Sequence, residues 1–176
     1  GCAIHAAVRL EIFTVLGENA SSAIEVAEAI AADSRAVGLL LDALSAMGLL
    51  EKSGRKYSTT EFSRQFLCVE SPSYMGHIIL HHHHILDGWA QLDRAVRTGK
   101  KVEKRSYGTE IERESFLMGM FNLAMAIAPK IASNFDLSGR RRLLDLGGGP
   151  GTYAIHFCLA NPELRAVILD RETTEP

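Results

Sequence analysis

Asp145-Leu146-Gly147-Gly148-Gly149-Pro150-Gly151 joins a predicted short strand, residues 141–146, to a helical pattern at residues 152–159. Residues 166–170 then form a continuous apolar run ending in aspartate, which is typical of a strand buried on both faces of a sheet. A strand, a glycine turn, a helix and a second strand make one βαβ unit. This order predicts the opening of an α/β sheet over residues 140–176.

The glycines and acidic residues of this unit indicate a nucleoside-binding site. Glycine leaves the backbone bare for the approach of a ligand and permits the positive φ values of a tight turn. Asp145 sits where its carboxylate can meet an ammonium group. Asp170 follows 25 residues later and closes the second strand, where a carboxylate can accept hydrogen bonds from both hydroxyls of a ribose.

Two other interpretations of the glycine cluster stay open. Gly149-x-Gly151-x-x-Ala154 fits a dinucleotide-binding turn if the frame is moved by two residues, and a glycine turn can also be purely structural. We prefer the unshifted frame, in which an acidic residue is followed by G-x-G-x-G at the strand end. In that frame the site does not have to bind a pyrophosphate.

The N-terminal region has the pattern of three helices followed by a hairpin. Apolar residues recur at helical spacing over residues 4–16, which predicts one amphipathic helix that ends near Gly17. A capping box at residues 22–25 begins a second helix, and residues 34–48 form a third. Residues 49–58 read as a short hairpin, so the whole region is a predicted winged helix.

Downstream of the hairpin the pattern stays helical. Residues 60–133 are predicted to be all α, with breaks at residues 71–73 and 98–109. A long uncharged stretch, residues 115–129, is shorter than the roughly 20 apolar residues that span a bilayer. We therefore predict a buried helix there and no membrane partner.

Composition and cysteine usage are those of a cytoplasmic protein. The formal net charge of -2 gives no general attraction to nucleic acid or to an acidic membrane. Cys2, Cys68 and Cys158 lie far apart and match neither a disulfide framework nor a zinc site. No basic segment leads a long apolar run at the N-terminus, so no secretory signal is expected.

A winged helix also occurs in transcriptional regulators, whose third helix enters the major groove of DNA. Here the third helix, residues 34–48, carries only Arg35 and Asp42, so it has no net charge and few side chains that could meet phosphates. Its leucines suit a protein interface instead. We expect no nucleic-acid partner, and the DNA-binding regulator stays as an alternative function.

Histidines gather at one place in the middle of the chain. His77, His81 and His84 fall near one helical face, but His81 to His84 are consecutive and therefore point around the whole helix. Asp87 is the one clear carboxylate nearby, and no cysteine is close. We favour interface or surface histidines over a polar wall of a substrate pocket, and both of these over a metal site.

Taken in order, these segments resemble the bacterial and plant small-molecule O-methyltransferases. These are class I methyltransferases with an N-terminal winged-helix dimerisation domain. The resemblance runs through residues 41–44, residues 47–50, Trp89-x-x-Leu92, Gly99, residues 121–125, residues 145–151 and Asp170.

The resemblance implies a fold and a reaction. It implies a mainly α winged-helix dimerisation domain at residues 1–98, a helical linker region at residues 99–139 and, at residues 140–176, the first βαβ unit of a Rossmann-like methyltransferase domain. S-adenosylmethionine would be the cofactor, and its methyl group would pass to a hydroxyl of a small, aromatic acceptor. The enzyme would be a homodimer whose N-terminal helices interlock.

The resemblance also implies which residues bind the cofactor. Gly147 and Gly149 would approach its methionine part, next to Asp145. Asp170 would hold the ribose and Arg171 the adenine. Met125 would lie near the sulfonium. Apart from the resemblance, the methionine-rich set Met118, Met120, Phe121 and Met125 suits either an apolar wall for the cofactor or acceptor, or plain core packing, and both interpretations stay open.

One departure from the family concerns catalysis. The family's sheet has seven strands and takes its catalytic histidine from a later segment, and none of the seven histidines here matches that position. We therefore assign no catalytic residue and expect the base beyond Pro176. Two strands and one helix cannot bury both faces of a sheet, so residues 140–176 are not expected to fold stably alone. A non-methylating relative that keeps the pocket stays open as another function.

Overall fold

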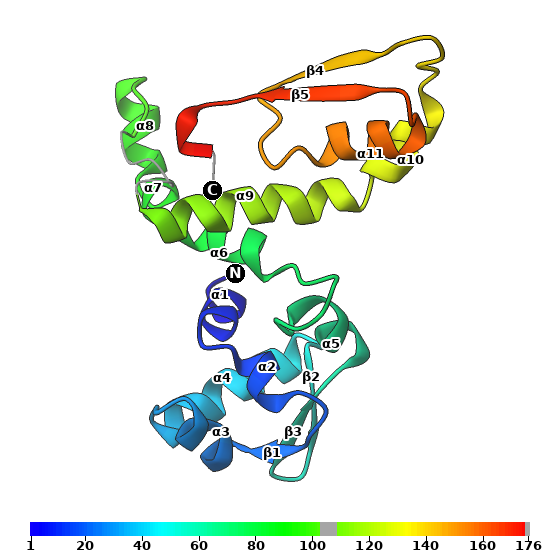
Figure 1. Ribbon diagram of the computed structural model, residues 1–176. Helices are drawn as coiled ribbons and strands as arrows, with labels where there is room; N and C mark the ends of the chain where they lie inside the picture. The colour runs from blue at the N-terminus through cyan, green and yellow to red at the C-terminus, as the bar shows by residue number, and fades with distance from the viewer. Residues whose placement is uncertain (103–108, 175–176) are drawn as a thin grey trace. The chain divides into compact units, whose positions relative to one another are not determined.

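The computed structural model describes residues 1–102 and 109–174, and the chain divides into two compact units, residues 1–105 and 106–176 (Figure 1). Each unit has its own secondary structure and its own buried side chains. The described elements of the first unit are α1 (Cys2–Arg9), α2 (Ile12–Leu16), β1 (Ser21–Ser22), α3 (Ala23–Ala29), α4 (Ser34–Ala46), β2 (Leu50–Ser53), β3 (Lys56–Thr59), α5 (Glu61–Leu67), α6 (Gly76–His84), α7 (Leu86–Trp89) and α8 (Leu92–Thr98).

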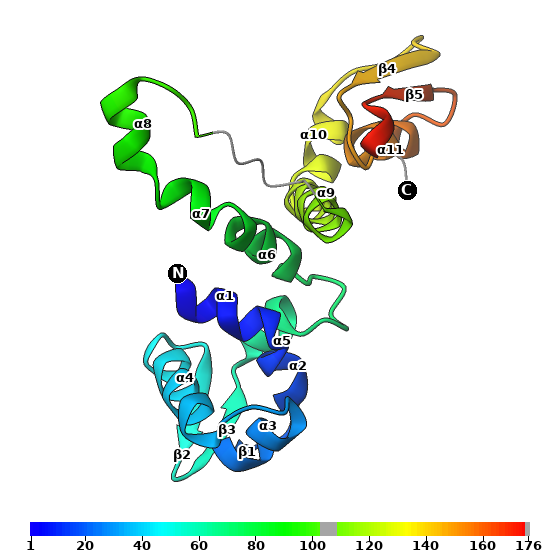
Figure 2. The ribbon, with the colours of Figure 1, turned by 90° about the vertical axis from the view of Figure 1, so that its left-hand side faces the viewer.

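The first unit contains the predicted winged helix. Strands β2 and β3 form the expected antiparallel hairpin, with Leu50 opposite Thr59 and Ser53 opposite Lys56. Strand β1 pairs with the other side of β3, which gives a three-stranded sheet of order β1-β3-β2 (Figure 2). The sequence did not predict β1, because two residues are too few to produce an alternating pattern.

The predicted helix over residues 4–16 is in fact two helices. α1 ends at Arg9 and α2 begins at Ile12, and Glu11 between them has a left-handed backbone with φ of 51°. The change of direction lets Val8 and Ile12 enter the same core. The prediction of one continuous helix was wrong, because the apolar spacing runs on through the break.

Both predicted helix starts are confirmed by side-chain caps. At the start of α3, Ser22 accepts a hydrogen bond at Oγ from the Glu25 N–H at 3.3 Å, and the Ser22 N–H donates to the Glu25 carboxylate at 2.6 Å. At the start of α4, Asp33 accepts a hydrogen bond from the Ala36 N–H at 2.8 Å. These caps satisfy N–H groups that have no partner within the helix.

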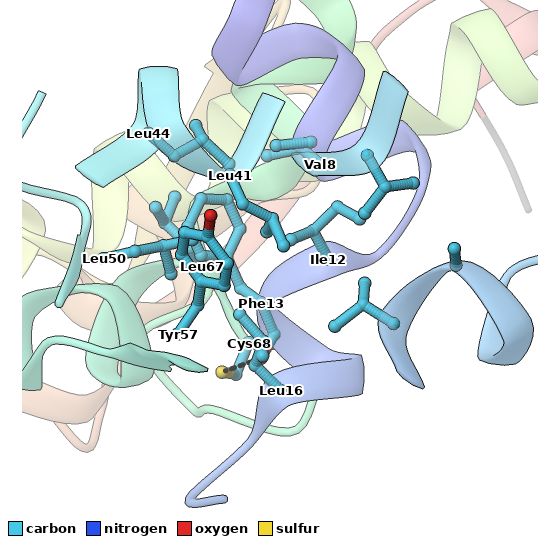
Figure 3. Close-up of a cluster of buried hydrophobic side chains, with 14 residues drawn as sticks. Val8, Ile12, Phe13, Leu16, Leu41, Leu44, Leu50, Tyr57, Leu67 and Cys68 are labelled. Carbon is cyan, nitrogen blue, oxygen red and sulfur yellow. Dashed lines mark hydrogen bonds between the residues drawn. The ribbon is translucent and has the colours of Figure 1, made fainter. Parts of the chain in front are cut away.

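The core of the first unit joins the helices to the wing. Figure 3 shows side chains from α1, α2, α4, β2, β3 and α5 that meet in one buried cluster. Phe13, Leu41 and Leu44 are completely buried there. Cys68 lies at the edge of the cluster, where its thiol donates to the Phe13 carbonyl at 3.3 Å.

Asp42 ties the third helix of the winged helix to the wing. Its Oδ1 accepts hydrogen bonds from Lys52 Nζ on β2 at 2.6 Å and from the Tyr57 hydroxyl on β3 at 2.7 Å. The hydrogen bond from Lys52 is the main cause that lowers the pKa of Asp42 below its ordinary value. The charged form of Asp42 therefore stabilises the fold.

Asp42→Ala is expected to lower the melting temperature of the protein at pH 7, by no more than a few degrees because the ion pair is exposed. Since the folded pKa is lowered, this contribution is complete above the unfolded pKa and disappears as the pH falls through the folded pKa. Thermal unfolding at pH 7 and pH 3 measures the effect. Tyr57→Phe, which removes one of the two donors but keeps the Asp42 carboxylate and its ion pair with Lys52, should give a smaller deficit. An equal deficit at both pH values would contradict the assigned role of the charge.

The second unit contains the predicted βαβ unit together with two helices that precede it. Its described elements are α9 (Glu110–Met125), α10 (Ala128–Asn134), β4 (Arg142–Leu146), α11 (Thr152–Ala160), β5 (Arg165–Leu169) and a 3-10 helix η1 (Glu172–Thr174). Strands β4 and β5 are parallel, with Arg142 beside Arg165 and Leu146 beside Leu169. The helices of residues 110–134, which lie in the predicted linker region of residues 99–139, belong to this unit.

Among the described residues of the second unit, helices cover one face of the two-stranded sheet and leave the other face exposed. In Figures 1 and 2, α10 and α11 lie on the same side of β4 and β5. On the other side, Leu144, Leu146, Val167 and Leu169 are 61%, 76%, 64% and 54% exposed. The expectation that two strands and one helix cannot bury both faces is confirmed.

The uncharged stretch at residues 115–129 spans a break between two helices. α9 and α10 meet at residues 126–127 with a bend of 51°. The buried side of α9 carries small residues, Ser115, Gly119 and Ala124. Within the described residues, no single helix has both the length and the apolar character needed to cross a bilayer, and only the bent pair meets both criteria when its two helices are taken together.

Candidate functional site

The turn between β4 and α11 has the backbone that its glycines predict. Gly147, Gly149 and Gly151 have φ values of 72°, 54° and 71°, in the left-handed region that favours glycine. At Gly148 the reason is space, because a Cβ there would lie 2.6 Å from the Asp145 carboxyl carbon. The turn is thus closely fitted to Asp145.

The N–H groups of this turn are largely used within the protein. Gly147 N–H donates to the Leu169 carbonyl at 2.7 Å, and Gly151 N–H donates to the Gly148 carbonyl at 2.9 Å. Gly149 N–H donates to Asp170 Oδ2 at 2.7 Å. A pyrophosphate is held by N–H groups that are free to point at it. Because these three are engaged, the geometry favours the unshifted frame over the dinucleotide pattern.

Asp170 accepts three hydrogen bonds from the protein. Besides the Gly149 N–H at Oδ2, its Oδ1 accepts from the Arg171 N–H at 2.7 Å and from the Thr174 hydroxyl at 3.0 Å. The Arg171 N–H is the main cause that lowers the pKa of Asp170, followed by the Gly149 N–H. A carboxylate accepts about four hydrogen bonds. Among the described residues, one acceptor position, at Oδ2, is therefore left for a ligand, and contact with both ribose hydroxyls stays a prediction.

Asp145 presents a carboxylate that the protein itself does not fully satisfy. The side chain is half-buried, and its shielded Oδ2 has no hydrogen-bond partner among the described residues. Such an oxygen is costly to leave without a donor. An ammonium group is a suitable donor, so Asp145 fits the amino-acid part of a nucleoside that carries an amino acid.

The glycine turn and α9 line an open cavity of about 520 Å³. This volume is within the range of small-molecule sites. One wall is polar and comes from Asp145, residues 147–149, Asp170 and Arg171, with Thr174 beside them. The opposite wall is apolar and comes from Phe116, Leu117, Met120, Leu123, Ala124 and Ile127. Five of the six predicted site residues thus meet in one cavity.

Met125 is the predicted site residue that the structure does not bring into the cavity. Its sulfur lies 3.4 Å from His156 Nε2 on α11. In a helix, a residue five positions after Met120 lies about 140° around the axis, so Met120 and Met125 face different directions. Of the proposed methionine wall, Met120 alone lines the cavity.

The apolar wall could have been predicted from the spacing of its residues in the sequence. Phe116, Met120, Leu123 and Ile127 are spaced by four, three and four residues, which is one face of a helix. Thr174 was not identified, because a single threonine near a strand end has no distinctive pattern.

The histidines of α6 belong to the first unit, where they pack against α1. Arg9 donates from Nη1 to His83 Nε2 at 3.0 Å, so this nitrogen of His83 carries no proton. The His5 ring lies edge-on to His83, with centroids 5.9 Å apart. Within the part of the chain that the structure describes, no three His, Cys, Asp or Glu side chains are grouped so as to hold a metal ion.

Acidification is expected to destabilise the packing of α1 on α6. Burial lowers the pKa of His83 below its ordinary value of 6.5, the charge of Arg9 lowers it further, and Asp87 acts in the opposite direction. Because the folded pKa is lowered, the stability contribution is complete above pH 6.5 and is lost as the pH falls through the folded pKa. The melting temperature should thus fall between pH 7.5 and pH 5.5.

The variant His83→Gln should make this fall shallower, while His82→Gln, at an exposed position of the same helix, should change it less, because His82 affects the fall only through its charge on His5 and His81. Thermal unfolding across the pH range measures both slopes. His5 and His81 also have a lowered pKa, so a residual slope is expected in His83→Gln. Identical slopes for the wild type and His83→Gln would refute the assignment.

Comparison with known protein families gives two adjacent matches. Residues 2–68 match the model of the O-methyltransferase dimerisation domain, and residues 89–173 match the model of the O-methyltransferase domain. The second match includes α9, the glycine turn and Asp170.

Individual relatives agree with these matches. The 3-hydroxy-5-methyl-1-naphthoate 3-O-methyltransferase of Streptomyces sahachiroi is 31% identical over 174 residues, which cover 95% of this chain and 50% of the relative. The structure of an O-methyltransferase family protein from Burkholderia thailandensis superposes with a TM-score of 0.84 at 29% identity, over 98% of this chain and 53% of that one.

A third comparison concerns a ligand complex. The structure of human N-acetylserotonin methyltransferase in complex with S-adenosylmethionine has the same fold, with a TM-score of 0.85 at 23% identity, over 98% of this chain and 56% of that chain. The present chain spans about half the length of the curated relatives it matches.

Proposed function

We propose that this chain, which belongs to the O-methyltransferase family with an N-terminal dimerisation domain, binds S-adenosylmethionine in the cavity of its second unit. One observation carries the proposal. Asp145 lies in β4, Asp170 directly follows the adjacent parallel strand β5, and both line the same cavity together with the glycine turn. S-adenosylmethionine carries an ammonium group and a ribose in one ligand, and these two groups match the pair of carboxylates.

Each polar residue of the cavity has a part in holding the cofactor. The free acceptor position of Asp170 receives a ribose hydroxyl, and Asp145 accepts from the ammonium group. Gly147 and Gly149 leave room for the methionine part, and Arg171 lies where it can contact adenine. The apolar wall formed by α9 excludes water from the opposite side.

The proposed reaction is methyl transfer to a hydroxyl of a small aromatic molecule. S-adenosylmethionine supplies a methyl carbon that is bonded to a positively charged sulfur. The residues of this chain contribute by fixing the cofactor and by shielding it from water, which aligns the two reactants. The acceptor hydroxyl needs a base, and we place that base in a segment of the whole protein outside residues 1–176.

The whole protein is proposed to act as a homodimer. The matched dimerisation model covers residues 2–68. In the same unit, Trp89, Leu92 and Val96 on α7 and α8 are 62%, 52% and 76% exposed. Large apolar side chains at the surface mark interaction sites. A second copy of the chain is the partner that we propose for them.

Calorimetric titration of the full-length protein tests the cofactor assignment. We expect binding of S-adenosylmethionine and of its demethylated product S-adenosylhomocysteine, and no comparable binding of NAD. Preference for NAD would favour the shifted glycine frame instead. A methyl-transfer assay with a panel of phenols then separates an enzyme from a relative that binds the cofactor without methylating.

A further inference from the structure

Thr174 forms a hydrogen bond to Asp170 in addition to the one that the glycine turn provides. It is the last residue of the 3-10 helix η1, which directly follows β5, and its N–H donates to the Arg171 carbonyl at 2.8 Å. Its hydroxyl points back to Asp170 and donates to Oδ1 at 3.0 Å. The residue also lines the cavity.

The Thr174 hydroxyl completes a fixed orientation of the Asp170 carboxylate. Gly149 holds Oδ2 at 2.7 Å, and Arg171 and Thr174 together occupy both acceptor positions of Oδ1. Asp170 is an exposed residue, so packing alone does not restrict its side-chain torsions. The three hydrogen bonds therefore set the direction of the one free acceptor position at Oδ2.

We propose that Thr174 is a positioning residue for nucleoside binding, which acts by holding Asp170 so that its free Oδ2 position faces a ribose hydroxyl. This inference rests on the proposed function, because it presumes that Asp170 contacts the ribose. Thr174 itself makes no contact with the reacting atoms. A carboxylate that is oriented before the ligand arrives loses less conformational freedom on binding.

The test uses the full-length protein and three variants, Thr174→Val, Thr174→Ser and Asp170→Ala. Valine keeps the shape of threonine but removes the donor, whereas serine keeps the donor. Titration with S-adenosylhomocysteine should show about tenfold weaker binding for Thr174→Val and a change within about twofold for Thr174→Ser. Adding Thr174→Val to Asp170→Ala should weaken binding no further, because the hydroxyl then has no carboxylate to hold.

A second readout separates positioning from a general structural role. The 2′,3′-dideoxy analogue of S-adenosylhomocysteine lacks both ribose hydroxyls, so the wild type should bind it more weakly than S-adenosylhomocysteine itself. Thr174→Val should reduce this difference, because its loss falls on the contact to the ribose hydroxyl. A loss that was equal for the two ligands would overturn the proposal in favour of a structural role.

The outcomes distinguish this inference from the proposed function. Absence of S-adenosylhomocysteine binding by the wild type would overturn the cofactor site, and the role of Thr174 with it. Normal binding by the wild type and unchanged binding by Thr174→Val would overturn the role of Thr174 alone. Tighter binding by Thr174→Val would also overturn it, since the hydroxyl would then compete with the ribose for Asp170.

Discussion

Replacement of Asp170 by alanine is expected to lower the affinity of the full-length protein for S-adenosylmethionine by about a hundredfold. The variant removes the acceptor for the ribose and, in the same step, the partner of the Gly149 N–H, which is 2.7 Å away. The turn thus loses one of the contacts that hold its shape. Calorimetric titration measures the affinity directly.

The matched control for Asp170→Ala is Asp136→Ala. Asp136 is another exposed aspartate of the second unit, and it accepts a local hydrogen bond from the Ser138 N–H at 2.9 Å. It does not line the cavity. Its replacement should leave the affinity for S-adenosylmethionine unchanged. If Asp170→Ala bound the cofactor as tightly as this control, Asp170 would have to be removed from the site.

Gly148→Ala is expected to produce the second large effect, a loss of S-adenosylmethionine binding of at least about tenfold. The added Cβ would lie 2.6 Å from Asp145 Cγ and 2.7 Å from Asp145 Oδ2, closer than atoms can approach. Either the turn or the carboxylate must move. Because Asp145 is placed to meet the ammonium group, either shift disturbs that contact. The affinity can be measured by the same titration.

Gly139→Ala provides a control of similar chemistry in the same unit. Gly139 has a φ of 73°, so alanine is strained there, but its Cβ would meet no atom within 4 Å. The strain should lower the melting temperature without changing cofactor affinity. Equal affinities for Gly148→Ala and Gly139→Ala would show that the fit between the turn and Asp145 has no part in binding.

The βαβ unit could be predicted from the sequence because its signals are local. Residues 145–151 combine a strand end, glycines and a helix start within one short stretch, and Asp170 follows at the end of the next strand. The capping box at Ser22 is equally local, since both of its hydrogen bonds lie within four consecutive residues. Such features depend little on the remainder of the fold.

Other features depend on distant parts of the chain and could not be predicted in the same way. The break at Glu11 is recognisable from the backbone and not from the apolar spacing, which continues through it. Whether the side chain of Met125 faces the cavity depends on how α9 packs against the βαβ unit. The presence of several methionines in one segment does not predict that packing. Thr174 gains its role from a hydrogen bond to Asp170 that no residue pattern marks.

The exposed face of the β4–β5 sheet affects whether the second unit can be prepared in isolation without self-association. Its aliphatic stripe, formed by Leu144, Leu146, Val167 and Leu169, ends at Arg142 and Arg165, two like charges placed side by side by the strand register. Stripped of neighbours, this surface would drive the unit to self-associate or to capture detergent. To keep the isolated second unit monodisperse, an added amphipathic segment would have to cover the four aliphatic side chains. The same segment would have to place a carboxylate opposite the two arginines.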